Sequence, residues 1–176
     1  MSNNNYYFPK IDGVKFKLKD IKSDEFILMT HLGLGDQIIL NGLVNHLSDK
    51  FKKIHLTVHS NTIENIQYLY SLNKKINLVE LPKDDELNTL ERYSTKNKLE
   101  ILQLGFENVK TIPFNLAYYR QLKIPYSYSM KYFFKPEDHK KEYNLQKELI
   151  NYYSADPSDI VLIHNDFCTN RRKIIS

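Results

Sequence analysis

A short, wholly apolar run that ends in a glycine-rich turn limits the fold of this chain more than any other feature. Residues 26–29 are all apolar, which is typical of a strand covered on both faces. Gly33 and Gly35 follow within six residues. Apolar side chains then recur every four residues, at Ile39, Leu43 and Leu47. This order predicts a buried strand, a tight turn and a helix over 36–48.

Strands and helices alternate along the rest of the chain. Apolar or alternating runs predict further strands at 14–18, 54–58, 76–81, 99–104 and 160–164. Helical patterns lie at 63–70, at 114–122, at 137–153 and from the acidic stretch 84–86 onward. Such alternation favours right-handed βαβ units. We expect an α/β fold, with a Rossmann-like parallel sheet covered by helices on both faces.

Composition excludes several classes of protein. Apolar residues make up 41% of the 176 residues, enough for a sizeable core. The formal charge of +4 is spread among acidic residues without a basic stripe, so nucleic acid is not an expected partner. Cys168 is the only cysteine, which rules out a disulfide within the chain and a cysteine zinc cage. No apolar run reaches the roughly 20 residues of a membrane helix, and we expect a cytoplasmic protein.

The predicted elements divide the chain into three segments. Residues 1–24 form a tail with an edge strand, residues 25–155 form the Rossmann-like domain, and residues 156–176 begin a second domain. After the predicted strand 160–164 the chain ends in a basic stretch without a closing helix. We therefore expect the second domain to be incomplete here.

The turn at 33–36 is the leading candidate for a binding site. Ligands of open α/β sheets bind at the carboxyl ends of the strands, beside backbone N–H groups and helix N-termini. The third glycine of a dinucleotide-binding turn is replaced by Ile38, and the Gly-Lys-Ser/Thr of a phosphate-binding loop is absent. Asp36 at the helix start would repel an anion and suits a neutral hydroxyl. It is either a general base or only a helix cap.

Residues 26–47, with their Gly-Asp pair at Gly35 and Asp36, resemble the opening of heptosyltransferase-like enzymes of glycosyltransferase family 9 and related GT-B proteins. The Thr-Pro pair usual in that family is replaced here by Asn41 and Gly42. The resemblance implies that the chain is the N-terminal, acceptor-side half of a GT-B glycosyltransferase. Asp36 would deprotonate the acceptor hydroxyl, which attacks a nucleotide sugar with inversion. Neither a metal nor another cofactor is implied, and this half is expected to be inactive alone.

The same resemblance suggests further binding residues. Those expected to contact the acceptor, a glycan or another hydroxyl compound, are His31, Gly33, Gly35 and Asn41. His31 has an alternative role as the partner of a carbonyl at the strand end. Those expected to contact the phosphates of the donor are His164, Asp166 and Arg171. A solvated basic surface is the alternative for this last group.

Other residue patterns are weaker. His55 and His59 share one strand face without a third ligand, so a zinc site is not expected. The aromatic-rich stretch 118–134 is interpreted as core packing, not as a platform for sugars. Two rival functions stay open on the same architecture: a nucleotide-sugar epimerase, and a non-catalytic α/β binding module in which Asp36 is only a cap. The oligomeric state is not determined by the sequence.

Overall fold

A computed structural model of the chain describes residues 6–11, 16–30, 32–105, 112–154 and 156. The chain divides into two compact units, residues 1–136 and residues 137–176. The predicted strand at 160–164 lies outside the described residues.

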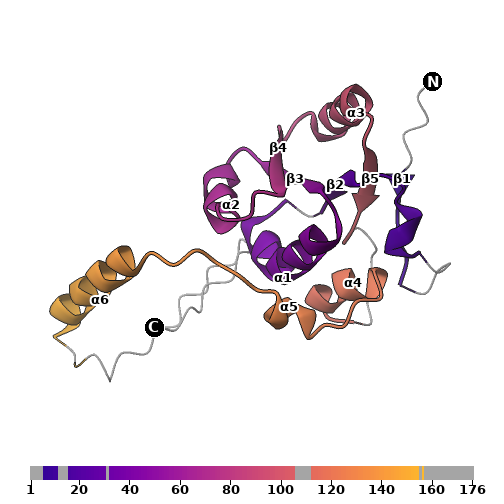
Figure 1. Cartoon of the computed structure of the whole chain (residues 1–176). Helices are drawn as coiled ribbons and strands as arrows, with labels where there is room; N and C mark the ends of the chain where they lie inside the picture. Colours follow the sequence, from indigo (N-terminus) through magenta and orange to yellow (C-terminus); the bar gives the residue numbers. More distant parts are fainter. Residues whose placement is uncertain (1–5, 12–15, 31, 106–111, 155, 157–176) are drawn as a thin grey trace. The chain divides into compact units, whose positions relative to one another are not determined.

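The first unit is built on a five-stranded sheet in which every pair of neighbouring strands is parallel (Figure 1). The strands are β1 (Tyr6–Tyr7), β2 (Glu25–Met29), β3 (Lys53–His59), β4 (Ile76–Leu81) and β5 (Glu100–Gln103). Their order across the sheet is β1-β5-β2-β3-β4. The sheet confirms the predicted Rossmann-like α/β fold, with four of the five strands within two residues of their predicted bounds.

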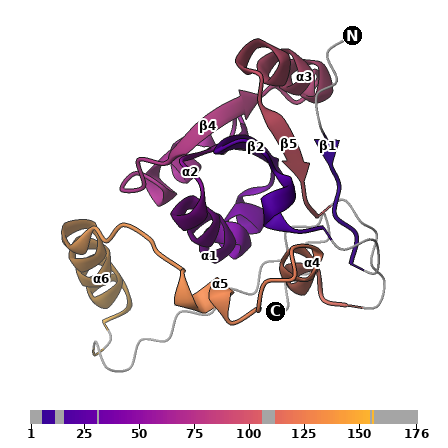
Figure 2. The ribbon, with the colours of Figure 1, turned by 45° about the vertical axis from the view of Figure 1, so that its right-hand side comes forward.

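Helices cover both faces of this sheet. They are α1 (Leu34–Lys50), α2 (Ile63–Leu69), α3 (Glu86–Asn97), α4 (Phe114–Gln121) and the short α5 (Tyr128–Lys131). Figures 1 and 2 show α1 and α4 together on one side of the sheet and α3 on the other. The arrangement follows from the sequence, because strands as apolar as β2 need a helix against each face.

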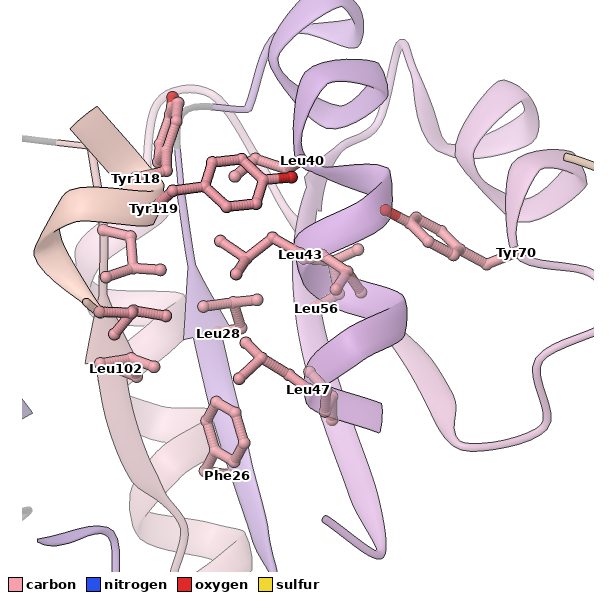
Figure 3. Close-up of a cluster of buried hydrophobic side chains, with 14 of the residues drawn as sticks. Phe26, Leu28, Leu40, Leu43, Leu47, Leu56, Tyr70, Leu102, Tyr118 and Tyr119 are labelled. Atoms are coloured by element: carbon pink, nitrogen blue, oxygen red, sulfur yellow. The ribbon is translucent and has the colours of Figure 1, made fainter. Parts of the chain in front are cut away.

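Each face has its own hydrophobic core. Side chains at even-numbered positions of β2 and β3, among them Phe26, Leu28 and Leu56, pack with α1 and α4 in the larger core (Figure 3). Ile27 and Met29 point to the opposite face and pack with Leu90 of α3. The alternation is the two-residue period of a strand, and it accounts for the apolar run at 26–29.

The chain connections place β3 and β5 on opposite sides of β2. From β2 the chain moves through α1 to β3 and then to β4, while α3 returns it across the other face to β5 on the far side of β2. The order therefore reverses between β2 and β5. In open parallel sheets this switch point, at the carboxyl ends of the strands, is where ligands bind.

The edge strand of the N-terminal segment differs from the prediction. We expected it at 14–18, of which residues 14 and 15 lie outside the described part, and Leu18 begins a 3-10 turn (Leu18–Asp20). The strand that the structure describes in this segment is Tyr6–Tyr7. The Tyr7 hydroxyl lies 2.8 Å from Glu100 Oε1, at the start of β5, and 2.9 Å from the carbonyl oxygen of Asp20. A long-range contact with β5 thus selects the edge strand, and alternation at 14–18 does not.

Helix bounds also differ in detail. The helix α1 begins at Leu34, two residues before the predicted start, and α5 was not predicted. The helix of the second unit, α6 (His139–Tyr153), was predicted from 137. Its N-terminus is capped by Asp138, whose carboxylate accepts a hydrogen bond from the backbone N–H of Lys141 at 3.0 Å. No helix in the described part of the chain is long and apolar enough to span a membrane.

Candidate functional site

The turn between β2 and α1 lies at the switch point of the sheet. Gly33 is the N-cap of α1, and Gly35 and Asp36 are the second and third residues of the helix. Gly33 and Gly35 are exposed, and Asp36 is half-buried. Asp36 is therefore in the first turn of α1, where the helix dipole favours a carboxylate, and it is not the N-cap residue itself.

The two glycines of this turn have different surroundings. A Cβ atom added to Gly33 would lie 2.9 Å from Oδ2 of Asp36, so the carboxylate is folded back over Gly33. A Cβ atom added to Gly35 would meet no atom within 4 Å. The turn thus holds a carboxylate on one side and is open on the other.

Tyr118 of α4 extends the site from a distant part of the sequence. Its side chain is fully buried, and in Figure 3 its hydroxyl points toward the carboxyl end of the sheet, beyond Leu28. Burial raises the pKa of Tyr118 well above its usual range, and the negative charge of Asp36 raises it further. The buried hydroxyl thus lies within electrostatic range of the carboxylate. The aromatic-rich segment that contains Tyr118 was predicted as core. No pattern in the sequence indicates that Tyr118 lies near Asp36.

A buried polar network supports the turn from beneath. Nε2 of Gln37 donates to Oγ1 of Thr30 at 3.1 Å and to the carbonyl oxygen of Thr57 at 3.3 Å. The hydroxyl of Thr57 donates to the carbonyl oxygen of Leu28 at 3.3 Å. Gln37, Thr30 and Thr57 are all fully buried. Because these bonds join α1 to β2 and β3, they fix the helix start that carries Asp36.

Gln121 of α4 joins the segment after β5 to the N-terminal segment. Its Oε1 accepts the backbone N–H of Gly105 at 2.9 Å, and its Nε2 donates to the carbonyl oxygen of Pro9 at 2.9 Å. Gly105, two residues after the end of β5, has a φ of 85°, a conformation that suits glycine. Residues 106–111, which follow, lie outside the described part.

Asn41 lies deeper in α1 than the other predicted acceptor residues. Its side chain is fully buried, and its Oδ1 accepts the backbone N–H of Phe134 at 2.8 Å and the side-chain amide of Asn45 at 3.1 Å. In this structure Asn41 holds the segment around α5 against α1. A contact with an acceptor would require that segment to move, so we leave Asn41 out of the proposed site.

The remaining predicted site residues are not described. His31, within the glycine turn, and His164, Asp166 and Arg171, near the C-terminus, lie outside the described residues. Their predicted contacts with acceptor and donor stay predictions. Of the predicted site residues, the structure therefore brings together Gly33, Gly35 and Asp36.

His55 and His59 have separate partners. His59, at the end of β3, faces Oε1 of Glu86 at 3.4 Å through Nε2 and the carbonyl oxygen of Leu81 at 3.4 Å through Nδ1. His55 lies on the same face nearer the amino end of the sheet, 2.8 Å from the Tyr93 hydroxyl and 3.4 Å from Glu25. Burial lowers the pKa of His55, although its hydrogen bond to Glu25 acts in the opposite direction.

The fold and this turn define a class of protein: a Rossmann-like α/β domain with a carboxylate at its switch point. Such a carboxylate can accept a proton from a neutral hydroxyl group. Comparison with protein-family models, with curated proteins and with solved structures finds no match to this chain.

Proposed function

We propose that this chain is the acceptor-side domain of a glycosyltransferase that transfers a sugar from a nucleotide sugar to a hydroxyl group. The observation that carries the proposal is the position of Asp36, half-buried in the first turn of α1 at the switch point. A carboxylate at the switch point disfavours an anionic ligand there and suits a hydroxyl group. The single cysteine fits a reducing compartment, and we propose a cytoplasmic location.

The proposed reaction needs one base on this domain. The Asp36 carboxylate accepts the proton of the acceptor hydroxyl. At the same time the oxygen of that hydroxyl attacks the anomeric carbon of the donor. The bond between that carbon and the diphosphate oxygen breaks, and the nucleoside diphosphate leaves with both electrons. Attack from the side opposite the leaving group inverts the anomeric carbon.

Acceptor binding tests the proposal directly on this chain. Isothermal calorimetry and NMR titration with mono- and disaccharides would compare the native chain with Asp36→Asn. A hydrogen bond to a charged group contributes about 1.5–3 kcal/mol, so we expect the substitution to weaken saccharide binding about tenfold or more. Asp49→Asn, at the exposed C-terminal end of the same helix, is the matched control and should bind as the native chain does.

Other outcomes would exclude the proposal in distinct ways. Saccharide binding that is equal in native and Asp36→Asn chains would reduce Asp36 to a structural residue in a binding module. Tight binding of a nucleotide on the glycine turn would place the donor where we place the acceptor. Mass spectrometry that finds an epimerised nucleotide sugar without any acceptor present would favour the epimerase alternative.

A further inference from the structure

A pocket lies at the carboxyl edge of the sheet, beyond the ends of β3 and β4. It has a volume of about 390 Å³ and is lined by His59, Ser60, Asn61 and Lys83. Ligand pockets in proteins measure about 300–1,000 Å³, so this one has room for a single small ring. All four lining side chains carry hydrogen-bonding groups. Neither the glycine turn nor Asp36 contributes to it.

Two hydrogen-bonded turns shape this pocket. After β3, the backbone N–H of Thr62 donates to the carbonyl oxygen of His59 at 3.0 Å, which makes Ser60 and Asn61 the central residues of a four-residue turn. After β4, the backbone N–H of Asp85 donates to the carbonyl oxygen of Pro82 at 3.0 Å, and Lys83 is a central residue of that turn. The pocket residues are therefore held in place by the backbone.

The lining residues differ in their availability to a ligand. Both ring nitrogens of His59 already face oxygen acceptors, the carbonyl oxygen of Leu81 and the carboxylate of Glu86. His59 therefore lines the pocket, but neither of its ring nitrogens is available to a ligand. Within the described part of the chain, the side chains of Ser60, Asn61 and Lys83 form neither a hydrogen bond nor an ion pair, and all three are exposed. They offer a hydroxyl, an amide and an ammonium group on pre-formed turns.

The charges around the pocket point to a neutral ligand. Lys83 supplies one positive charge, but the exposed carboxylate of Asp84 is next to it in the chain and Glu86 borders the pocket through His59. A phosphate group would gain little attraction from this balance. A neutral compound with several hydroxyl groups matches the donors and acceptors present.

We propose that this pocket binds a second sugar ring of the acceptor, so that the preferred acceptor is an oligosaccharide of at least two rings. The inference rests on the proposed function, because it places the reacting ring at Asp36. Neighbouring parallel strands lie about 4.8 Å apart, which puts the ends of β3 and β4 roughly 5–10 Å from the end of β2. That separation corresponds to the next one or two rings along a chain.

The experiment compares a disaccharide with its monosaccharide. Glucose and galactose, and the β-1,4- and α-1,4-linked disaccharides of each, are titrated into the native chain while backbone amide resonances are followed by NMR. We expect disaccharides to shift the amides of Ser60, Asn61 and Lys83 and to bind at least tenfold more tightly than monosaccharides. The double substitution Ser60→Ala/Lys83→Ala should remove that advantage. Ser71→Ala/Lys74→Ala, an exposed serine and lysine at the opposite edge of the sheet, should retain it.

Each outcome has one meaning. Equal affinity for mono- and disaccharides, or a disaccharide advantage that survives Ser60→Ala/Lys83→Ala, would overturn the second ring site and leave the role of Asp36 intact. Disaccharide binding that Asp36→Asn does not weaken would overturn the proposed function instead, even where the pocket amides shift. Absence of binding by every saccharide tested would overturn both.

Discussion

Gly33 and Gly35 are two residues apart, yet they serve the site in different ways. Gly33 leaves room for the Asp36 carboxylate, because an added Cβ atom would come within 2.9 Å of Oδ2. Gly35 faces open space and is the second residue of α1, with no need for a left-handed backbone. The fold alone therefore does not explain why Gly35 is a glycine.

Gly35→Ala separates stability from binding. Alanine in place of glycine within a helix stabilises by about 0.5–1 kcal/mol, so we expect a higher midpoint of urea denaturation. The added methyl group also narrows the open side of the turn, so saccharide affinity measured by calorimetry should fall. A chain that is more stable and binds saccharides as before would show that no ligand approaches Gly35.

The helix α1 both carries a residue of the proposed site and packs against a distant segment of the chain. Its first turn carries Asp36, and its middle receives the segment around α5. Asn41 and Asn45 hold the backbone of that segment, through Phe134 N–H at 2.8 Å and the Tyr132 carbonyl oxygen at 3.3 Å. The rings of Tyr128 and Tyr132 pack on His46 of α1.

Gly42 makes this contact possible, and Gly42→Ala should disrupt it. A Cβ atom there would lie 2.3 Å from the carbonyl oxygen of Ser129 and 2.7 Å from that of Tyr128. Because both atoms are backbone, α5 has to move away, and we expect destabilisation of about 1–3 kcal/mol. Urea denaturation measures this, with Gly35→Ala in the same helix as the control of opposite sign. Unchanged stability would mean that α5 does not pack on Gly42 in solution.

Across the whole of the first unit, a polar network ties four elements together at the amino end of the sheet. His55 of β3 lies 2.8 Å from the Tyr93 hydroxyl of α3 and 3.4 Å from Glu25 of β2. Asn77 of β4 donates to the Tyr93 hydroxyl at 3.3 Å. Burial lowers the pKa of His55, and hydrogen bonds from Lys52 and then His55 lower the pKa of Glu25.

Both shifts predict loss of stability in acid. His55 has a lower pKa in the folded chain than its unfolded value of 6.5, so the unfolded chain binds more protons as the pH falls below about 6.5. Glu25 acts in the same direction below its unfolded value of 4.5. We expect the Tm to be highest above pH 6.5 and to fall steadily toward pH 4. Differential scanning calorimetry across this range measures the slope.

A pair of variants identifies the source of this slope. His55→Gln removes one titrating group and should flatten the decrease in Tm between pH 6.5 and pH 5. A residual slope is expected from His46, whose pKa is also lowered by burial. Gln146→Ala, on the exposed surface of α6, removes no titrating group and should leave the slope unchanged. An identical slope in His55→Gln would contradict the assignment to this network.

The sequence by itself determined the alternation of strands and helices, the parallel sheet and the carboxylate beside the glycine turn. These features depend on short-range patterns: an apolar run at 26–29, a four-residue period in the next helix, and a Gly-Asp pair within one turn. The physical reason is that burial of one face and the geometry of a turn act on neighbouring residues.

Only the tertiary structure decided which distant residues complete the site. Tyr118 comes within electrostatic range of Asp36, Gln121 joins Gly105 to Pro9, and β1 pairs with β5 at Tyr6–Tyr7. The turns after β3 and β4 become one pocket because parallel strands end at the same edge. Asn41, predicted as an acceptor residue, is covered by a segment more than 80 residues further along the chain, and no local pattern encodes that contact. Such partners are chosen by packing between elements, which the periodicity of a single element does not specify.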